Sequence, residues 1–163
     1  MELNNEKLEL DAVDLRILGQ LQTDASISNQ DLAAKAHVSP PTCLRRVKRL
    51  RDLGVIERQI ALLSPHKLKA ILGHGLTAIV EVTLTQQHSE LLEAFEARIA
   101  TERAVQQCYR VSPGPDFVLI VQVREMPDYL AFVQRVFTQD AQVRNVKAYF
   151  SVLRSKFEPA LVL

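Results

Sequence analysis

The sequence has little cysteine. Its two cysteines, Cys43 and Cys108, lie far apart and neither belongs to a CxxC pair. This spacing argues against a disulfide framework and a zinc site, and favours both residues as small hydrophobes of a core. The four histidines show no HxxxH or HExxH spacing. We therefore expect no bound metal and no metal cofactor.

Long hydrophobic runs are also missing. The apolar stretches, such as Ala78–Val80 and Phe117–Val121, are far shorter than the ~20 residues that a membrane span needs. The segment Met1–Asp14 alternates acids and leucines instead of joining a basic region to an apolar one, so it does not resemble a signal peptide. With 47% hydrophobic and 24% charged residues, the composition predicts a packed core, no membrane partner and a cytoplasmic location.

Catalytic motifs are absent as well. The sequence has no Ser/His/Asp or Cys/His set, no GxGxxG or GxxxxGKS/T loop, and no paired carboxylates with an acid/base role. Asp116 stands beside a Pro/Gly turn and is the only carboxylate to consider, but a turn cap or a contact to a ligand amine suits it better. We therefore do not expect an enzyme.

Charge is present and unevenly distributed. The net charge is only +1, yet residues 1–31 hold seven acids against two bases, and residues 32–58 hold seven bases against two acids. The rest of the chain is close to neutral. A local basic region of this kind is typical of a surface that contacts phosphate.

Three helices are predicted in the first third of the chain. Asp11 can cap the first helix, whose apolar residues recur every three to four positions. Ser28 opens a short second helix through a capping box with Asp in place of Glu or Gln. The third helix is predicted from Pro40 to Leu53, with Ser39 as its N-cap. About three residues separate the last two helices, as in a helix-turn-helix.

The third predicted helix has one apolar and one basic face. Cys43, Val47 and Leu50 share the first, and the opposite side carries the bases. An exposed basic face is often only solvated, but here it follows a tight turn and begins with capped N–H groups that can meet a phosphate, so we predict that it binds double-stranded DNA. Arg45 and Arg49 are suited to base edges. The predicted DNA-contacting set is Ser39, Thr42, Arg45, Arg46, Lys48 and Arg49.

Gly54 is predicted to end the third helix. Beyond it, Val55–Leu63 is apolar and partly β-branched and predicts a strand or short ribbon that forms a wing. Residues 64–74 read as a linker with one short helical turn. From residue 75 the patterns alternate as strand, helix, strand, strand, helix, strand. The predicted elements are 76–84, 88–100 with Ser89 as a candidate cap, 104–111, 116–124, 128–138 and 143–153.

These patterns predict an α+β protein with a winged helix-turn-helix at residues 1–63 and a ferredoxin-like βαββαβ domain at residues 75–163. Both helices of the second domain would cover one face of its sheet. The other face is left partly hydrophobic by Ile79, Val118, Ile120 and Tyr149. An apolar face of this size predicts a homodimer formed through the sheet.

The first third strongly resembles the Lrp/AsnC family of leucine-responsive, or feast/famine, regulators, and the second domain is similar to it by pattern. The residues that carry this resemblance are Leu10-Asp11, Asp14, Ile17-Leu18, Leu21-Gln22, Asp24, Ile27-Ser28-Asn29, Asp31-Leu32-Ala33, Val38-Ser39-Pro40, Cys43-Leu44-Arg45-Arg46-Val47, Leu50, Gly54-Val55-Ile56 and Ala61-Leu62-Leu63-Ser64-Pro65.

The resemblance implies a transcription regulator whose second domain senses an amino acid and assembles dimers into an octamer, a tetramer of dimers. The family's effector loop has the pattern glycine, any residue, an aromatic residue and aspartate, and the matching stretch here is 112–117. Aligning Asp116 with the family's aspartate puts Pro113 where glycine is usual, with Gly114 one place late. The resemblance thus implies an effector site at Ser112, Pro113, Gly114, Pro115 and Asp116. A turn without a ligand role is the alternative for this loop. An architectural DNA-wrapping protein without a ligand response is the alternative for the whole chain.

Overall fold

The computed structural model describes residues 9–73 and 75–163 and divides by packing into two compact units. Of the described residues, the first unit holds those up to Leu62 together with Lys156–Leu163, and the second holds those from Leu63 to Ser155. Within the described residues, no helix combines the length and apolar character required to cross a membrane.

The first unit is built on three helices, α1 (Ala12–Thr23), α2 (Asn29–Ala36) and α3 (Pro40–Asp52). Two of the three N-caps predicted for these helices, Asp11 and Ser28, are confirmed by their capping hydrogen bonds. Asp11 accepts hydrogen bonds from the amides of Val13 and Asp14, and Asp14 accepts one from the Asp11 amide. Ser28 Oγ accepts the amide of Asp31 at 3.1 Å and donates its own hydrogen to the Asp31 carboxylate at 2.6 Å. Two short side chains thus fix where α1 and α2 begin.

A tight turn places α3 against α1 and α2. His37 ends α2 in the left-handed region at φ 58°, and the Asn29 side chain donates to the Pro40 carbonyl across the turn at 2.9 Å. The face of α3 predicted to be apolar, with Cys43, Val47 and Leu50, is buried. It packs against Ile17, Leu18, Leu32, Ala33 and Ala36 of the other two helices.

The predicted wing is wrong as a strand. Gly54 stops α3 at φ 72°, as expected, but residues 57–63 form no strand. A strand needs a neighbour to satisfy its amide and carbonyl groups, and no strand of the described residues pairs with this segment. The linker is also more ordered than predicted, because Pro65–Leu72 forms a two-turn helix, α4, capped by Ser64 and ended by Gly73 at φ 73°.

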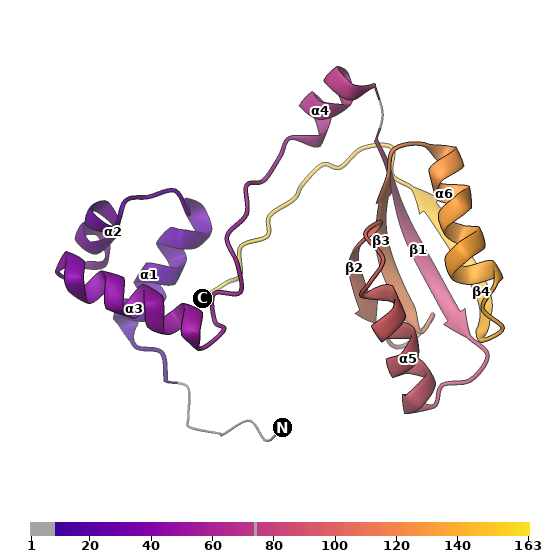
Figure 1. Cartoon of the computed structure of the whole chain (residues 1–163), viewed down its shortest axis with the longest axis horizontal. Helices are drawn as coiled ribbons and strands as arrows, with labels where there is room; N and C mark the ends of the chain where they lie inside the picture. The colour runs from indigo at the N-terminus through magenta and orange to yellow at the C-terminus, as the bar shows by residue number, and fades with distance from the viewer. Residues whose placement is uncertain (1–8, 74) are drawn as a thin grey trace. The chain divides into compact units, whose positions relative to one another are not determined.

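The second unit is the predicted βαββαβ arrangement (Figure 1). Its antiparallel sheet has the order β2-β3-β1-β4. Both helices cover one face, because their buried residues pack with alternate residues of β1 and β3. The elements are β1 (Leu76–Leu84), α5 (Ser89–Ile99), β2 (Val105–Arg110), β3 (Phe117–Val123), α6 (Met126–Val133), the π-helical turn η1 (Gln134–Thr138) and β4 (Val143–Phe150).

Three predicted boundaries of this unit need correction. The N-cap of α5 is His88 instead of Ser89, and its side chain makes no capping hydrogen bond. The helix predicted from residue 128 begins at Met126, because Pro127 suits a first-turn position where no amide donor is needed. The closing strand ends at Phe150 instead of Leu153, because Ser151 already lies opposite the start of β1 and donates to the Thr77 carbonyl.

Candidate nucleic-acid interface and effector loop

The solvent side of α3 presents two bases that are free to meet a ligand. Arg45 and Lys48 are exposed, and neither side chain has a hydrogen bond or ion pair within residues 9–73 and 75–163. Leu44 beside them is 61% exposed, so the helix offers an apolar contact next to its charges. Arginine and lysine on an exposed helix of a helix-turn-helix are the side chains that contact base edges and phosphates.

Arg46 and Arg49, in contrast, are turned back onto α1. Arg46 Nη1 lies 2.7 Å from an Asp11 oxygen and 2.9 Å from Asp14 Oδ1, and Arg49 Nη1 lies 3.1 Å from Asp14 Oδ2. Arg49 also donates to the Glu9 carbonyl at 3.3 Å. These four charged side chains, Asp11, Asp14, Arg46 and Arg49, are called the α1–α3 charge cluster below.

Burial makes the α1–α3 charge cluster more than a surface ion pair. The Asp14 side chain is 1% exposed, against 24% for Arg46 and 46% for Arg49. Hydrogen bonds from the Asp14 amide and from Arg46 lower the pKa of Asp11, and the two carboxylates raise the pKa of Arg46 in turn. Arg46 Nε is buried without a hydrogen-bond partner. The cluster therefore holds α3 at a fixed position on α1.

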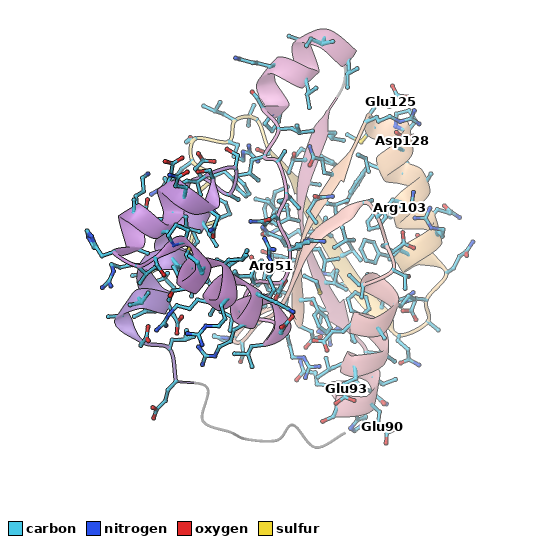
Figure 2. The ribbon with its side chains drawn as sticks, turned by 60° about the vertical axis from the view of Figure 1, so that its left-hand side comes forward. Arg51, Glu90, Glu93, Arg103, Glu125 and Asp128 are labelled. Atoms are coloured by element: carbon cyan, nitrogen blue, oxygen red, sulfur yellow. The ribbon has the colours of Figure 1, made fainter. Side chains whose placement is uncertain are left out.

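The α1–α3 charge cluster decides which of the predicted arginines on α3 is free to contact a base. Of the arginines on α3, Arg51 in the last turn (labelled in Figure 2) donates to Gln59 at 3.0 Å. Arg46 and Arg49 are ion-paired. Arg45 is the one without a partner in the part of the chain that the structure describes. Arg49 would have to leave Asp14 to reach a base, so Arg45 is the stronger of the two candidates.

The N-terminus of α3 differs from what we predicted. Ser39 is the N-cap by position, but its side chain accepts no amide hydrogen, and its hydroxyl lies 2.9 Å from the hydroxyl of Thr42. Pro40 and Pro41 occupy the first two helical positions and have no N–H. The first turn thus offers the Thr42 amide instead of a set of capped donors, together with the hydroxyls of the exposed Ser39 and the half-buried Thr42.

The predicted effector loop joins β2 and β3. Ser112, Pro113 and Gly114 are exposed, with Gly114 at φ 122°, and the Ser112–Pro113 peptide bond is cis. Asp116 is buried, and its Oδ2 accepts the Leu84 amide at 2.7 Å. The Asp116 amide donates to the Val82 carbonyl at 2.9 Å. Asp116 therefore fastens the loop to the end of β1 and leaves the first three loop residues facing solvent.

Replacing Asp116 tests this fastening. Asp116→Ala removes the acceptor of the Leu84 amide, and we expect the free energy of unfolding of the second unit to fall by about 1–2 kcal/mol. Asp116→Asn keeps an acceptor oxygen, so its free energy of unfolding should fall by less than that of the alanine variant. All three tyrosines lie in the second unit and the chain has no tryptophan, so tyrosine fluorescence during urea unfolding reports this unit. Equal stability of the alanine variant and the native chain would contradict the assigned role.

The uncovered face of the sheet carries the residues predicted for it. Ile79 and Tyr149 stand opposite each other on β1 and β4 and are 40% and 43% exposed, and Tyr109 on β2 is opposite Val118. Lys147 lies opposite Glu81, with its amine 4.8 Å from the Tyr149 ring. This face combines apolar and paired charged residues over all four strands.

Acidic side chains of the second unit do not gather into a metal site. Glu90 and Glu93 project from the first turns of α5, and Glu125 and Asp128 lie at the start of α6, at the other end of the unit (Figure 2). No group of three or more His, Cys, Asp or Glu residues that could hold a metal ion occurs among residues 9–73 and 75–163.

Sequence reasoning missed two features of the first unit. Asp14 entered the charge balance and the family resemblance without a structural role, although an acid on the apolar side of an amphipathic helix, three residues before Ile17, could have indicated a buried ion pair. Gln22 was named only as part of the family resemblance, without a partner, yet its side chain is hydrogen-bonded to the backbone of Leu161. No local sequence pattern predicts a contact between Gln22 and Leu161, which lie 139 residues apart.

Comparison with known proteins covers both units. The model of the AsnC-type helix-turn-helix domain matches residues 10–51, and that of the Lrp/AsnC ligand binding domain matches residues 77–161. A leucine-responsive regulatory protein and an uncharacterized HTH-type transcriptional regulator, both of Haemophilus influenzae, are each 37% identical over 94% of this chain and cover 90% and 89% of their own lengths.

Solved structures agree with these matches. An AsnC family transcriptional regulator from Agrobacterium tumefaciens superposes with a TM-score of 0.81 at 30% identity, over 94% of this chain and 97% of that one. A transcriptional regulator from Neisseria meningitidis, in a complex with L-Met, gives 0.80 at 27% identity over the same shares of the two chains.

Proposed function

Because this chain belongs to the Lrp/AsnC family of DNA-binding transcriptional regulators, we propose that α3 contacts DNA through Arg45, Lys48 and Thr42. The observation that carries this proposal is that Arg45 and Lys48 are exposed on the second helix of the helix-turn-helix and unpaired within the described residues. Ser39 is proposed to contact a phosphate through its hydroxyl. Arg46 and Arg49 act first as supports of α3. A regulator that meets DNA in this way works in the cytoplasm.

Salt titration with Lys48→Ala tests the phosphate role. Each phosphate neutralised by a basic side chain releases counterions, so the affinity falls steeply with salt. Lys48→Ala should weaken binding by a similar factor on every DNA sequence and reduce the slope of log K against log salt concentration by about 1. Mobility shifts at several salt concentrations measure both. Lys69→Ala, on the exposed α4, is the matched control, and an unchanged slope in Lys48→Ala would exclude the contact.

The second unit is proposed to sense a free amino acid at the loop of Ser112, Pro113, Gly114, Pro115 and Asp116. The match to the ligand binding domain and the L-Met complex of the Neisseria relative support this proposal. Pro113 and Pro115 have no N–H with which to hold a ligand carboxylate, so Gly114 is the loop residue with a free approach to its backbone. No other cofactor is proposed.

Calorimetry with each of the twenty amino acids tests the sensor. Binding of one or a few, lost in Asp116→Ala but kept in the ion-pair variant Glu96→Gln, would support the loop as the site. Glu96 is suited as the control because it pairs with Arg110 at the end of β2, next to the loop, and contributes to no loop hydrogen bond among the described residues. Absence of binding by all twenty would favour an architectural DNA-wrapping protein.

The uncovered face of the sheet is proposed to form a homodimer, and dimers to assemble further into an octamer. Paired helix-turn-helix units can then read two half-sites about one turn of DNA apart. Ile79 opposite Tyr149 and Glu81 opposite Lys147, on neighbouring strands, give this face both apolar side chains and charges of both signs for a second copy.

Sedimentation measures the contribution of Ile79 to the dimer. Ile79→Ala removes three carbon atoms from each copy of the interface, so we expect dissociation of the dimer to increase by at least about tenfold. Leu130→Ala, which trims an exposed leucine on α6 at the covered side of the sheet, should leave dissociation of the dimer unchanged. A native chain that sediments at 18.4 kDa at micromolar concentration would contradict the dimer.

A further inference from the structure

The last eight residues of the chain pack with the DNA-binding unit. Lys156–Leu163 follow β4, the closing strand of the sensory unit, and the match to the ligand binding domain extends to residue 161. By packing, however, they belong to the unit that holds α1, α2 and α3 (Figure 1). A segment of the sensory domain sequence thus lies on the DNA-binding unit.

Gln22 on α1 holds this segment by its side-chain amide. Its Nε2 donates to the Leu161 carbonyl at 3.1 Å, and its Oε1 accepts the Leu161 amide at 2.6 Å. One glutamine thereby satisfies both backbone polar groups of one residue, as a neighbouring strand would. The Leu161 side chain stays 74% exposed, so the main chain carries the contact.

The surroundings of Gln22 fit an extended apolar peptide. The C-terminal half of α1, the extended segment 55–62 and the tail line an open cavity of about 940 Å³. Leu18, Leu21, Val55, Ile56 and Ile60 supply its apolar wall. This segment is the one predicted as a wing, and it pairs with no strand of the described residues, so the tail lines the cavity together with a segment that no sheet holds.

We propose that the groove formed by the C-terminal half of α1 and residues 55–62 is the docking site of the chain's own C-terminal segment, Phe157–Leu163, and that Gln22 is the residue on which docking depends. The chain then joins its two units twice, once through the segment around α4 and once through the residues between β4 and the tail. A unit tied at one point can turn freely on its linker, whereas a second attachment restricts its orientations. The tail, Phe157–Leu163, is therefore a second attachment to the DNA-binding unit, called the strap below.

Hydrogen exchange of the full-length protein tests the docking without DNA or effector. We expect the peptide covering residues 157–163 to exchange about tenfold faster in Gln22→Ala than in the native chain, because two hydrogen bonds are lost. Gln20→Ala is the matched control on the same helix, since the Gln20 side chain makes no hydrogen bond with the tail among the described residues. Equal exchange in the two variants, or a native tail that exchanges like an unfolded peptide, would overturn the proposal.

A photo-crosslinking residue in place of Leu161 identifies the occupant. Cross-links within one chain to α1 or to residues 55–62, abolished by Gln22→Ala and kept in Gln20→Ala, are the expected result. Cross-links that join two chains would show that the tail of a second copy fills the groove, and would overturn docking of the chain's own segment. Neither readout depends on amino-acid sensing, so failure of the strap and failure of the sensor are distinguishable.

Discussion

Arg45→Ala is expected to weaken binding of an operator by about 1–3 kcal/mol, a factor of roughly 5 to 150 in affinity. Arginine can make a bidentate contact to guanine, and Arg45 is exposed and unpaired among the described residues, so it loses no internal ion pair when it binds. The loss should be largest on the best operator and small on unrelated DNA, because a base contact carries sequence information and a phosphate contact does not.

Mobility-shift titrations at a single salt concentration, with an operator and with an unrelated duplex, measure this difference. Arg51→Ala is the control, because Arg51 lies on the same helix but is bonded to Gln59. Equal losses on the two duplexes would move Arg45 from base reading to phosphate contact. Unchanged binding would remove it from the interface.

Arg49→Ala separates the two roles that one arginine can have. If Arg49 reads a base as predicted from the helix faces, its replacement should reduce the preference for the operator. If its contact with Asp14 is its main role, the free energy of unfolding should fall and the preference for the operator should stay. The pair of distances from Arg49 Nη1 to Asp14 and Nη2 to the Glu9 carbonyl favours the second result.

Local signals in the sequence were enough to predict most of the fold. Asp11 and Ser28 define helix starts because a cap acts on amides two or three residues away, and the buried side of α3 follows from its period alone. Strict alternation in β1 likewise fixes which of its residues face the helices. Each of these features depends on neighbours that the sequence itself places nearby.

The rest depended on partners that are distant in the sequence. The direction of Arg46 and Arg49 is set by Asp14, 32 and 35 residues earlier, and a helical wheel shows only that the two lie on the polar side of α3. Val55–Leu63 has the composition of a strand but no strand beside it in the described chain. The tail is bonded across 139 residues. Tertiary contacts of this kind override what composition favours.

Asp14→Ala is expected to destabilise the first unit by about 2–3 kcal/mol. Removing one partner of a fully buried ion pair costs about 3–5 kcal/mol, because the other charge is left uncompensated. The cost is lower here because Arg46 retains Asp11 and both guanidiniums reach solvent. Asp14→Asn keeps the size of the side chain and an acceptor for the Asp11 amide, but loses the charge, and should lie between the alanine variant and the native chain.

Hydrogen exchange of peptides from α1 and α3 measures this effect in the full-length chain, because tyrosine fluorescence reports only the second unit. Asp52→Ala removes an exposed acid from the last turn of α3 and should change stability by less than about 0.5 kcal/mol. Because the charge cluster holds α3 against α1, Asp14→Ala should also weaken DNA binding without any contact of Asp14 to DNA. A variant that keeps native stability but loses DNA binding would place Asp14 in the interface instead of beneath it.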